Sequence, residues 1–553
     1  MTRAWRLGFA ALYVLVLGAG LALGLDVMIA GYSPVPFADF WAQLPLVERG
    51  IDGDLAAGDL WEQWNEHRIP LARLQFIADY AVVDGTNVLL FGVIATSCVL
   101  LAAVFAAAIW LDTRDGVLAL GTMAAASCAT LSPAGIENLT WAFQVAFVQA
   151  FLYATVSMLA AVLAARAATP AWSAIATGAC ALAAAAATYS LANGVLVWPI
   201  VVVLVALLGA GRRVTAALAG AGVLTVGSFL WGFDASARGN LSDPFGLIHF
   251  VLVYLGSIVW GAGSSAAAVV GAAGLVLFAA VCALGWRVRS GRAVAAPFGA
   301  AVAPFIVLTA AQTAIGRLDL GVAQALSSRY SIASATFWLG LLVGVLPALR
   351  LRTARAVTPV VLAGAGALAV VVGFRMLPAE SFLPTVVFGR ELTVVAYRTG
   401  VEDRSQIPPV GQAGPGVRAA LVWMEREELG PWAPGGMVDE MRVGNLGPPT
   451  QRCAGRVDAA TPVDGGTRFE GWVDAPDGEA TSRHGVVLDG SAARVGQALV
   501  GAYRPDARPL GASDVWRGFV AYAPSTSRSP LDLVLPDESR DRAVCSLRLR
   551  EDG

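Results

Sequence analysis

The chain has 553 residues, of which 57% are hydrophobic and only 14% are charged, and its mean hydropathy is +0.65. This composition excludes an ordinary soluble domain and predicts an integral membrane protein. The formal net charge of -2 also argues against nucleic acid as a general partner.

Apolar runs long enough to cross a bilayer recur through residues 1–376. The first run follows MTRAWR, and because no convincing small-residue cleavage site precedes Gly31, we expect an uncleaved membrane helix rather than a signal peptide. The pattern predicts a polytopic α-helical membrane protein with about eleven spans. The expected spans lie near 8–30, 87–111, 116–133, 140–165, 170–189, 191–210, 214–233, 263–286, 294–316, 331–349 and 356–376.

Arginine placement predicts the orientation of these spans. With the N-terminus in the cytoplasm, most arginines between spans fall on the cytoplasmic side, as the positive-inside rule requires. We therefore expect a multi-pass protein of the cytoplasmic membrane, with its C-terminal domain on the extracytoplasmic side. The apolar segment from Pro244 to Gly261 would break this alternation, so it is predicted to be an interfacial or re-entrant helix, with a twelfth span as the alternative.

A long polar loop, residues 32–86, separates the first two spans. Charges this dense are expected to face water, where they need no desolvation. Within the loop, Pro70 and the apolar residues after it predict a surface helix that ends before Asp84 and Gly85. The acidic residues of the loop are Asp39, Glu48, Asp52, Asp54, Asp59, Glu62, Glu66, Asp79 and Asp84.

The C-terminal part has a different pattern. Residues 377–450 contain Pro- and Gly-rich stretches typical of a linker region. From 451 to 553, short alternating runs separated by turn residues predict an extracytoplasmic β-sandwich domain. Cys453 and Cys545 are predicted to form a disulfide that ties the ends of this domain together, with two free thiols as the alternative.

In the predicted topology, most ionisable loop residues face the outer side. An acidic residue soon after the first span (Asp39 in FADFW), many spans and an outer C-terminal domain resemble the GT-C superfamily of polytopic glycosyltransferases. The segments WEQWNEHR, GIENLTWAFQ, YSLANGVLVWP and SSRYSIASATFW also resemble segments associated with that superfamily. The resemblance covers the GT-C-like transmembrane domain, residues 1–376.

The resemblance implies an inverting transfer of a sugar from a polyprenyl-phosphate donor to a cell-envelope glycan or glycolipid at the outer face. Asp39 takes the role of general base, accepting the proton of the attacking hydroxyl. Phe40 follows Asp39 where the commoner pattern has a second acid, so no cofactor is certain and a divalent cation stays open. No metal-ligating residues are predicted.

Further site residues are candidates because of their chemistry and their position in the outer loops. Glu66 and His67 are second choices for the base, and arginine suits phosphate because its planar fork donates two parallel hydrogen bonds. The candidates for the donor phosphate are Arg329, with Tyr330 beside it, Arg68 and Arg317. The candidates for sugar or acceptor contacts, with ordinary membrane-interface residues as the alternative, are Trp41, Trp64, Glu137, Asn138, Gln144 and Asn193.

Two other classes of function remain open at this stage. A transporter or flippase of lipid-linked glycans would place charges inside its spans, and these spans carry few. A non-catalytic envelope assembly or adhesion protein would use the C-terminal domain as its working part.

Overall fold

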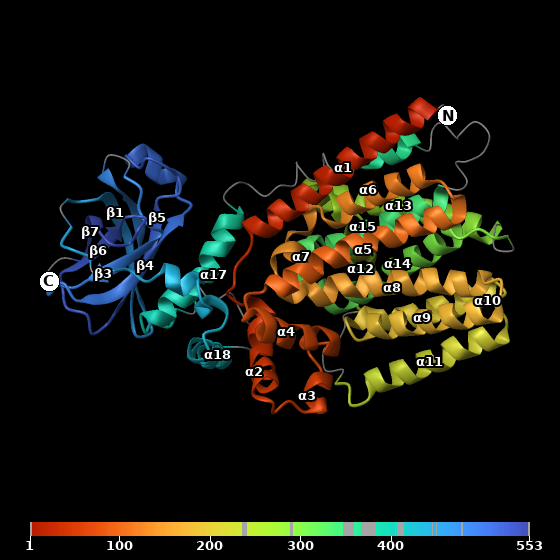
Figure 1. Cartoon of the computed structure of the whole chain (residues 1–553), viewed down its shortest axis with the longest axis horizontal. Helices are drawn as coiled ribbons and strands as arrows, with labels where there is room; N and C mark the ends of the chain where they lie inside the picture. The colour runs from red at the N-terminus through yellow and green to blue at the C-terminus, as the bar shows by residue number, and fades with distance from the viewer. Residues whose placement is uncertain are drawn as a thin grey trace. The chain divides into compact units, whose positions relative to one another are not determined.

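The computed structural model divides the chain into two compact units (Figure 1). Unit 1 comprises Met1–Ile29, Ala56–Gln75 and Leu90–Leu377, and unit 2 comprises Ala30–Leu55, Phe76–Leu89 and Pro378–Gly553. The structure describes residues 3–234, 241–287, 291–346, 359–366, 382–403, 405, 414–444, 446–449, 451–476 and 479–550.

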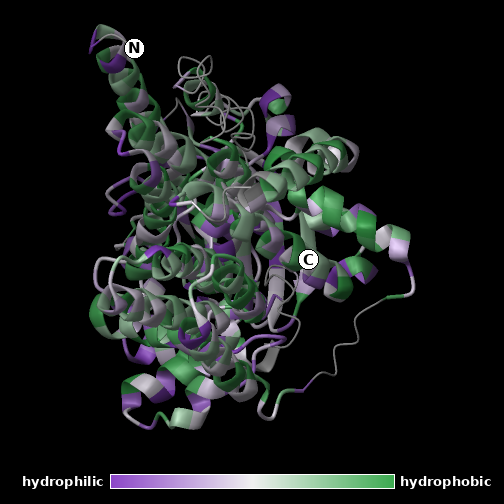
Figure 2. Ribbon diagram, turned by 90° about the vertical axis from the view of Figure 1, so that its right-hand side faces the viewer, coloured by the Kyte–Doolittle hydropathy of each residue, from purple (hydrophilic) through white to green (hydrophobic). Residues whose placement is uncertain are grey.

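Unit 1 consists of helices whose apolar residues dominate the ribbon (Figure 2). In a bilayer a helix satisfies its own backbone hydrogen bonds, so long apolar runs adopt this form. Helices α8, α9 and α11 lie side by side (Figure 1). The helices in or entering this unit are α1 Arg3–Ala30, α3 Ala57–Trp61, α5 Val88–Thr113, α6 Gly116–Thr130, α7 Ile136–Thr140, α8 Val145–Arg166, α9 Pro170–Thr188, α10 Val197–Leu207, α11 Arg212–Leu230, α12 Pro244–Leu255, α13 Gly263–Arg287, α14 Ala295–Arg317 and α15 Ser331–Val345.

Short 3-10 helices connect several of these elements. They begin or end the polar loops in which most candidate site residues lie. Their bounds are η2 Pro133–Gly135, η3 Ala142–Gln144, η4 Ala192–Leu196, η5 Ser257–Ala262, η6 Leu318–Leu320, η7 Val322–Leu326 and η8 Ser328–Tyr330.

Seven helices among the described residues are long and apolar enough to cross a membrane, and a bent pair from Gly116 to Thr140 makes up to eight. The multi-pass membrane character is therefore confirmed, whereas the count of about eleven is not. The predicted span 191–210 forms a shorter apolar helix, Ala192–Leu207. The predicted span 331–349 corresponds to α15, although residues 347–349 are not among the described residues. The predicted span 356–376 lies largely outside the described residues.

The segment that disturbed the predicted alternation is short. Helix α12 has 12 residues and is followed by η5, which is kinked at Val259. A helix of this length rises about 18 Å, well below the roughly 30 Å of a bilayer core. The length therefore fits the predicted interfacial or re-entrant helix better than a twelfth span.

The polar loop after the first span is folded into helices. Its elements are η1 Ala38–Gln43, α2 Leu44–Asp52, α3 and α4 Pro70–Val83. As predicted, α4 begins at Pro70 and ends before Asp84 and Gly85, which have φ angles of +55° and +69°. A Cβ at Gly85 would lie 2.5 Å from the Tyr80 ring, so this turn requires glycine for space as well as for conformation.

The C-terminal domain is a single curled antiparallel sheet, a half-barrel, and the predicted two-sheet sandwich is not observed. Its strands follow the order β1-β2-β5-β4-β3-β6-β7. The edges β1 and β7 approach each other, because Arg452 forms a parallel bridge with Ser546. The strand bounds are β1 Ala454–Val463, β2 Gly466–Asp474, β3 His484–Leu488, β4 Arg494–Ala502, β5 Gly518–Pro524, β6 Leu531–Pro536 and β7 Ala543–Arg550.

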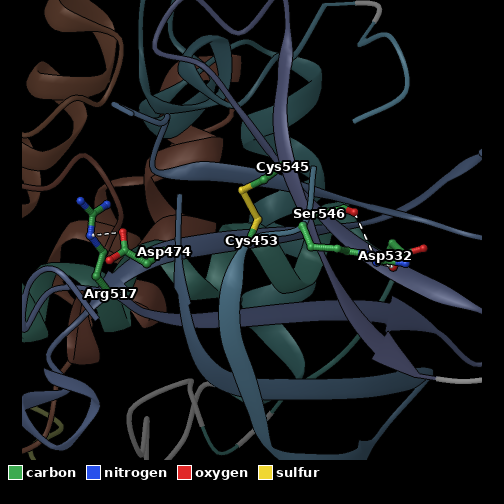
Figure 3. Close-up of a disulfide and its surroundings, with 7 residues drawn as sticks. Cys453, Asp474, Arg517, Asp532, Cys545 and Ser546 are labelled. Carbon is green, nitrogen blue, oxygen red and sulfur yellow. Dashed lines mark hydrogen bonds and ion pairs between the residues drawn. A yellow bond between two sulfur atoms is a disulfide. The ribbon is translucent and has the colours of Figure 1, made fainter. Parts of the chain in front are cut away.

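The predicted disulfide is present at the meeting of these edges (Figure 3). The Cα atoms of Cys453 and Cys545 are 5.0 Å apart, and both residues are buried in the core of the half-barrel. The Cys453 amide also donates to the Ser546 carbonyl over 2.9 Å. The bond therefore closes a sheet that has no second sheet to cover its edges.

The described part of the predicted linker region, 377–450, is mostly helical and belongs to unit 2. Its helices are α17 Phe382–Arg398, α18 Gly414–Arg426, η10 Gly430–Trp432 and α19 Met437–Glu440. Trp423 of α18 stacks on Tyr80 at 5.5 Å, and Phe40 lies 4.8 Å from Phe76. This aromatic core explains why the segment is ordered although its Pro- and Gly-rich stretches suggested otherwise.

Candidate functional site

Loops that lie far apart in the sequence meet in unit 1. Gln63 and the backbone of Asp234 exchange two hydrogen bonds of 2.9 Å, and Ala192 donates its N–H to His67. Glu66 contacts Arg317, and Glu137 contacts the loop before α15. All these loops were predicted to share one face of the membrane, and these contacts place their ends together.

A tight turn presents the two titratable residues of the first loop. Trp64 and His67 exchange two backbone hydrogen bonds of 2.8 Å, which leaves Asn65 and Glu66 at the tip. Asn65 has a φ of +48°, a conformation that asparagine tolerates better than most residues. The turn directs the adjacent side chains of Glu66 and His67 toward different partners.

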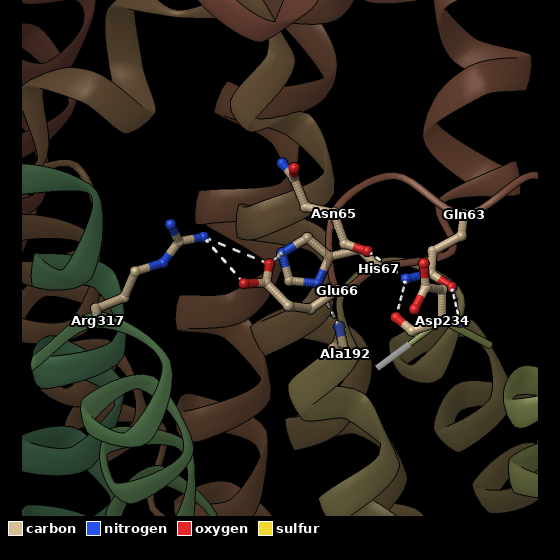
Figure 4. Close-up of polar contacts among 7 residues, drawn as sticks. All are labelled: Gln63, Asn65, Glu66, His67, Ala192, Asp234 and Arg317. Carbon is tan, nitrogen blue, oxygen red and sulfur yellow. Dashed lines mark hydrogen bonds and ion pairs between the residues drawn. The ribbon is translucent and has the colours of Figure 1, made fainter. Parts of the chain in front are cut away.

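Glu66, His67 and Arg317, hereafter the Glu66 cluster, lie together as a partly exposed group of ionisable side chains (Figure 4). Both Glu66 carboxylate oxygens lie 3.4 Å from Nη2 of Arg317, and His67 Nε2 lies 4.0 Å from Oε2. The exposed side-chain fractions are 34% for Glu66, 22% for His67 and 37% for Arg317. A pair this exposed stabilises the fold by at most about 1 kcal/mol, so the fold would lose little stability if a ligand replaced Glu66 as the partner of Arg317.

The hydrogen bond of His67 fixes its tautomer. The Ala192 N–H donates to Nδ1 over 3.1 Å, so Nδ1 carries no proton. The pKa of His67 is lowered to about 4, mainly by burial of the ring. The negative charge of Glu66 raises this pKa, and the positive charge of Arg317 lowers it. The ring is therefore neutral near neutral pH and offers an Nε2–H donor. His67 suits the binding of an oxyanion better than the role of base considered from the sequence.

This arrangement predicts an acid sensitivity. Because the folded pKa lies below the ordinary 6.5, the unfolded state binds more protons between these values, and stability falls as the pH drops through this window. His67→Gln, which cannot titrate, is expected to lose less thermal stability than the wild type between about pH 7 and pH 4. Melting of the detergent-solubilised chain measures the difference. His249→Gln, at an exposed position on α12, is the control, and equal slopes for wild type and His67→Gln would contradict the assignment.

Arg68, a predicted phosphate ligand, has a structural task. Its guanidinium donates to the carbonyls of Phe229 and Trp231, over 2.7 and 2.6 Å, and to that of Trp61. The first two carbonyls belong to the C-terminal end of α11, where backbone acceptors lack helical partners and a positive charge is favourable. The residue is 4% exposed, so it holds the loop against α11 and is not presented to a ligand.

Glu137 also has a structural role, because it accepts hydrogen bonds from the loop before α15. Its Oε2 accepts hydrogen bonds of 2.8 Å from both Ser327 and Ser328 and one of 3.0 Å from the Arg329 amide. This carboxylate therefore fixes the loop that carries the Arg329 side chain. The guanidinium carbon of Arg329 lies 5.5 Å from the centre of the Tyr330 ring, which itself is buried. The adjacent serines were not singled out in the sequence, because their partner Glu137 lies about 190 residues away.

The three predicted amide contacts, Asn138, Gln144 and Asn193, are buried. Asn138 donates to the Arg329 carbonyl over 3.1 Å, and Asn193 donates to Thr309 over 3.3 Å. In the part of the chain that the structure describes, each of the three amide oxygens has no hydrogen-bond donor. These oxygens are acceptors that water or a hydroxyl group can fill.

No family model and no curated protein matches this sequence. The assignment of the site therefore depends on the geometry above and on the chemistry of its residues.

Three other predicted residues do not belong to the Glu66 cluster. Trp41 is 1% exposed, so its ring has no free face for a sugar. Trp64 is partly buried beside the turn. Asp39 lies in η1 of unit 2 and is partly exposed. Among the described residues, no group of three or more His, Cys, Asp and Glu side chains could hold a metal ion.

Proposed function

We propose that the protein is a membrane glycosyltransferase that moves a sugar from a polyprenyl-phosphate donor to a cell-envelope glycan or glycolipid. The observation that carries this proposal is the Glu66 cluster. It places a cation and a neutral histidine donor beside a partly exposed carboxylate, in a unit made of membrane-length helices. A lipid-linked phosphate needs this combination of hydrogen-bond donors next to an apolar phase.

In the proposed reaction the acceptor hydroxyl oxygen attacks the anomeric carbon of the sugar. The bond from that carbon to the phosphate oxygen breaks, and the polyprenyl phosphate leaves with the bonding electron pair. Arg317 and the His67 Nε2–H donate to the phosphate oxygens and stabilise the charge that develops there. The hydroxyl proton passes to a carboxylate: the resemblance implies Asp39, and Glu66, which orients Arg317, is the alternative within unit 1.

The test is an assay of the purified full-length chain in lipid with a radiolabelled polyprenyl-phosphate sugar and an envelope glycan extract. The proposal expects label in the glycan and release of unlabelled polyprenyl phosphate. A transporter would instead move the intact labelled lipid across a sealed vesicle, and an adhesion protein would bind glycan without consuming the donor. Either of these outcomes, without transfer, would overturn the proposal.

A further inference from the structure

Unit 1 contains an apolar cavity away from the Glu66 cluster. It has a volume of about 420 Å³ and lies between α10, α13 and α14. Its walls are hydrocarbon side chains except for Cys282 and the indole of Trp286. Representative lining residues are Val203, Leu207, Ala300 and Leu308.

The environment of the cavity is hydrocarbon. Helices α13 and α14 both contain segments long and apolar enough to cross a membrane. Val203, Leu207, Trp286 and Leu308 are exposed although they are large and apolar. In water such a surface would be unfavourable, but in a bilayer an acyl chain covers it.

The cavity runs along α10 from Pro199 to Leu208 and reaches the helix ends opposite the Glu66 cluster. Helix α10 starts after η4, which carries Ala192, and α14 ends at Arg317, so both reach the cluster with one end. The lining residues include Leu207 and Leu208 at the other end of α10 and Pro297 near the start of α14. The cavity therefore extends to the end of the bundle that the arginine pattern predicts to be cytoplasmic.

Arginines lie in both loops that begin at this end. After Leu208, Gly209 and Gly211 with positive φ angles turn the chain into Arg212 and Arg213, which are exposed. Arg292 is exposed in the connection from α13 to α14, six residues after Trp286. Basic residues at the cytoplasmic end of membrane helices attract the headgroups of anionic lipids.

We propose that this cavity binds one acyl chain of an anionic glycerophospholipid, whose phosphate contacts Arg212, Arg213 and Arg292. The hydrocarbon walls contact the acyl chain, and the positively charged arginines favour an anionic headgroup over a neutral one. Such a lipid would be held between three helices rather than exchange freely with the surrounding bilayer. This inference does not depend on the proposed function.

Native mass spectrometry of the detergent-purified chain with added phosphatidylglycerol or phosphatidylcholine tests the proposal. The wild type is expected to retain phosphatidylglycerol preferentially. Arg212→Gln with Arg213→Gln is expected to reduce this preference about 30-fold, since each basic residue near the headgroup contributes about 1 kcal/mol. Arg114→Gln, an exposed arginine in the connection from α5 to α6, is the matched control and should retain the preference.

Filling the cavity provides a second, independent measurement. Val203→Trp and Ala300→Phe are each expected to lower retention of phosphatidylglycerol at least tenfold, because they occupy the space of the chain. Val223→Trp, at an exposed apolar position on α11 outside the cavity, should have no effect. Equal retention of both lipids by the wild type, or unchanged retention in folded cavity-filling variants, would overturn the proposal. Displacement of phosphatidylglycerol by polyprenyl phosphate at equal concentration would also overturn it, and would assign the cavity to the donor.

Discussion

The Asp39→Asn variant is expected to transfer sugar about 10²- to 10⁴-fold more slowly than the wild type. Asparagine has nearly the same shape as aspartate, but its amide cannot take the proton from the attacking hydroxyl. Asp39 is partly exposed at the start of η1. Initial rates with the labelled polyprenyl-phosphate donor measure the effect, and unchanged melting of the variant confirms that it is folded.

Two variants of the Glu66 cluster separate proton transfer from phosphate binding. Arg317→Ala is expected to raise the KM for the donor about 10- to 100-fold, the effect of losing a charge-assisted hydrogen bond. Glu66→Gln should have a smaller effect, because it removes only the partner that orients Arg317 at 3.4 Å. Near-normal rates for Asp39→Asn together with a loss of at least 100-fold for Glu66→Gln would move the base to Glu66.

Replacing both Cys453 and Cys545 with serine is expected to destabilise the half-barrel by about 4 to 5 kcal/mol. The two residues are separated by 92 positions, so the disulfide restricts a long loop in the unfolded chain. The loss approaches the whole stability of a small domain. Trypsin, which cleaves after the many arginines of this domain, should degrade it in the double variant and spare it in the wild type.

Reductant supplies the matched control for the disulfide. A thiol reductant should make the wild-type half-barrel sensitive to trypsin and have no further effect on the double variant. The remaining cysteines among the described residues, Cys98, Cys128, Cys180 and Cys282, are free thiols and lie in unit 1. A double variant as resistant as the oxidised wild type would show that the sheet is closed without the bond.

Several features of the fold followed from local sequence signals. Helix α4 starts at Pro70 and ends before Asp84, as the proline and the Asp-Gly break indicated. Cys453 and Cys545 pair because they flank a domain of alternating strands, and two loops predicted to share one face of the membrane contact one another through His67 and Ala192. The ends of α4 depend on neighbouring residues, and the shared face of the loops depends on the alternation of spans, so both could be predicted from the sequence.

The arrangement of the strands and the partners of the arginines could not be predicted from the sequence pattern. The strands were recognised, but alternation does not reveal whether seven strands form two stacked sheets or one curled sheet. Arg68 and Arg317 looked equally suited to phosphate, yet one meets carbonyls at the end of α11 and the other meets Glu66. The partners that distinguish the two arginines come from segments more than one hundred residues away.

The amino-acid sequence by itself determined the membrane class, the polar loops between apolar helices and the disulfide, because apolar length, charge placement and cysteine position act locally or through the bilayer. Only the tertiary structure decided which ionisable groups remain available. Burial and long-range contacts commit Arg68 and Glu137 to the fold, and they leave Glu66, His67 and Arg317 partly exposed. The reason is that the availability of a polar side chain depends on the donors and acceptors that folding brings to it.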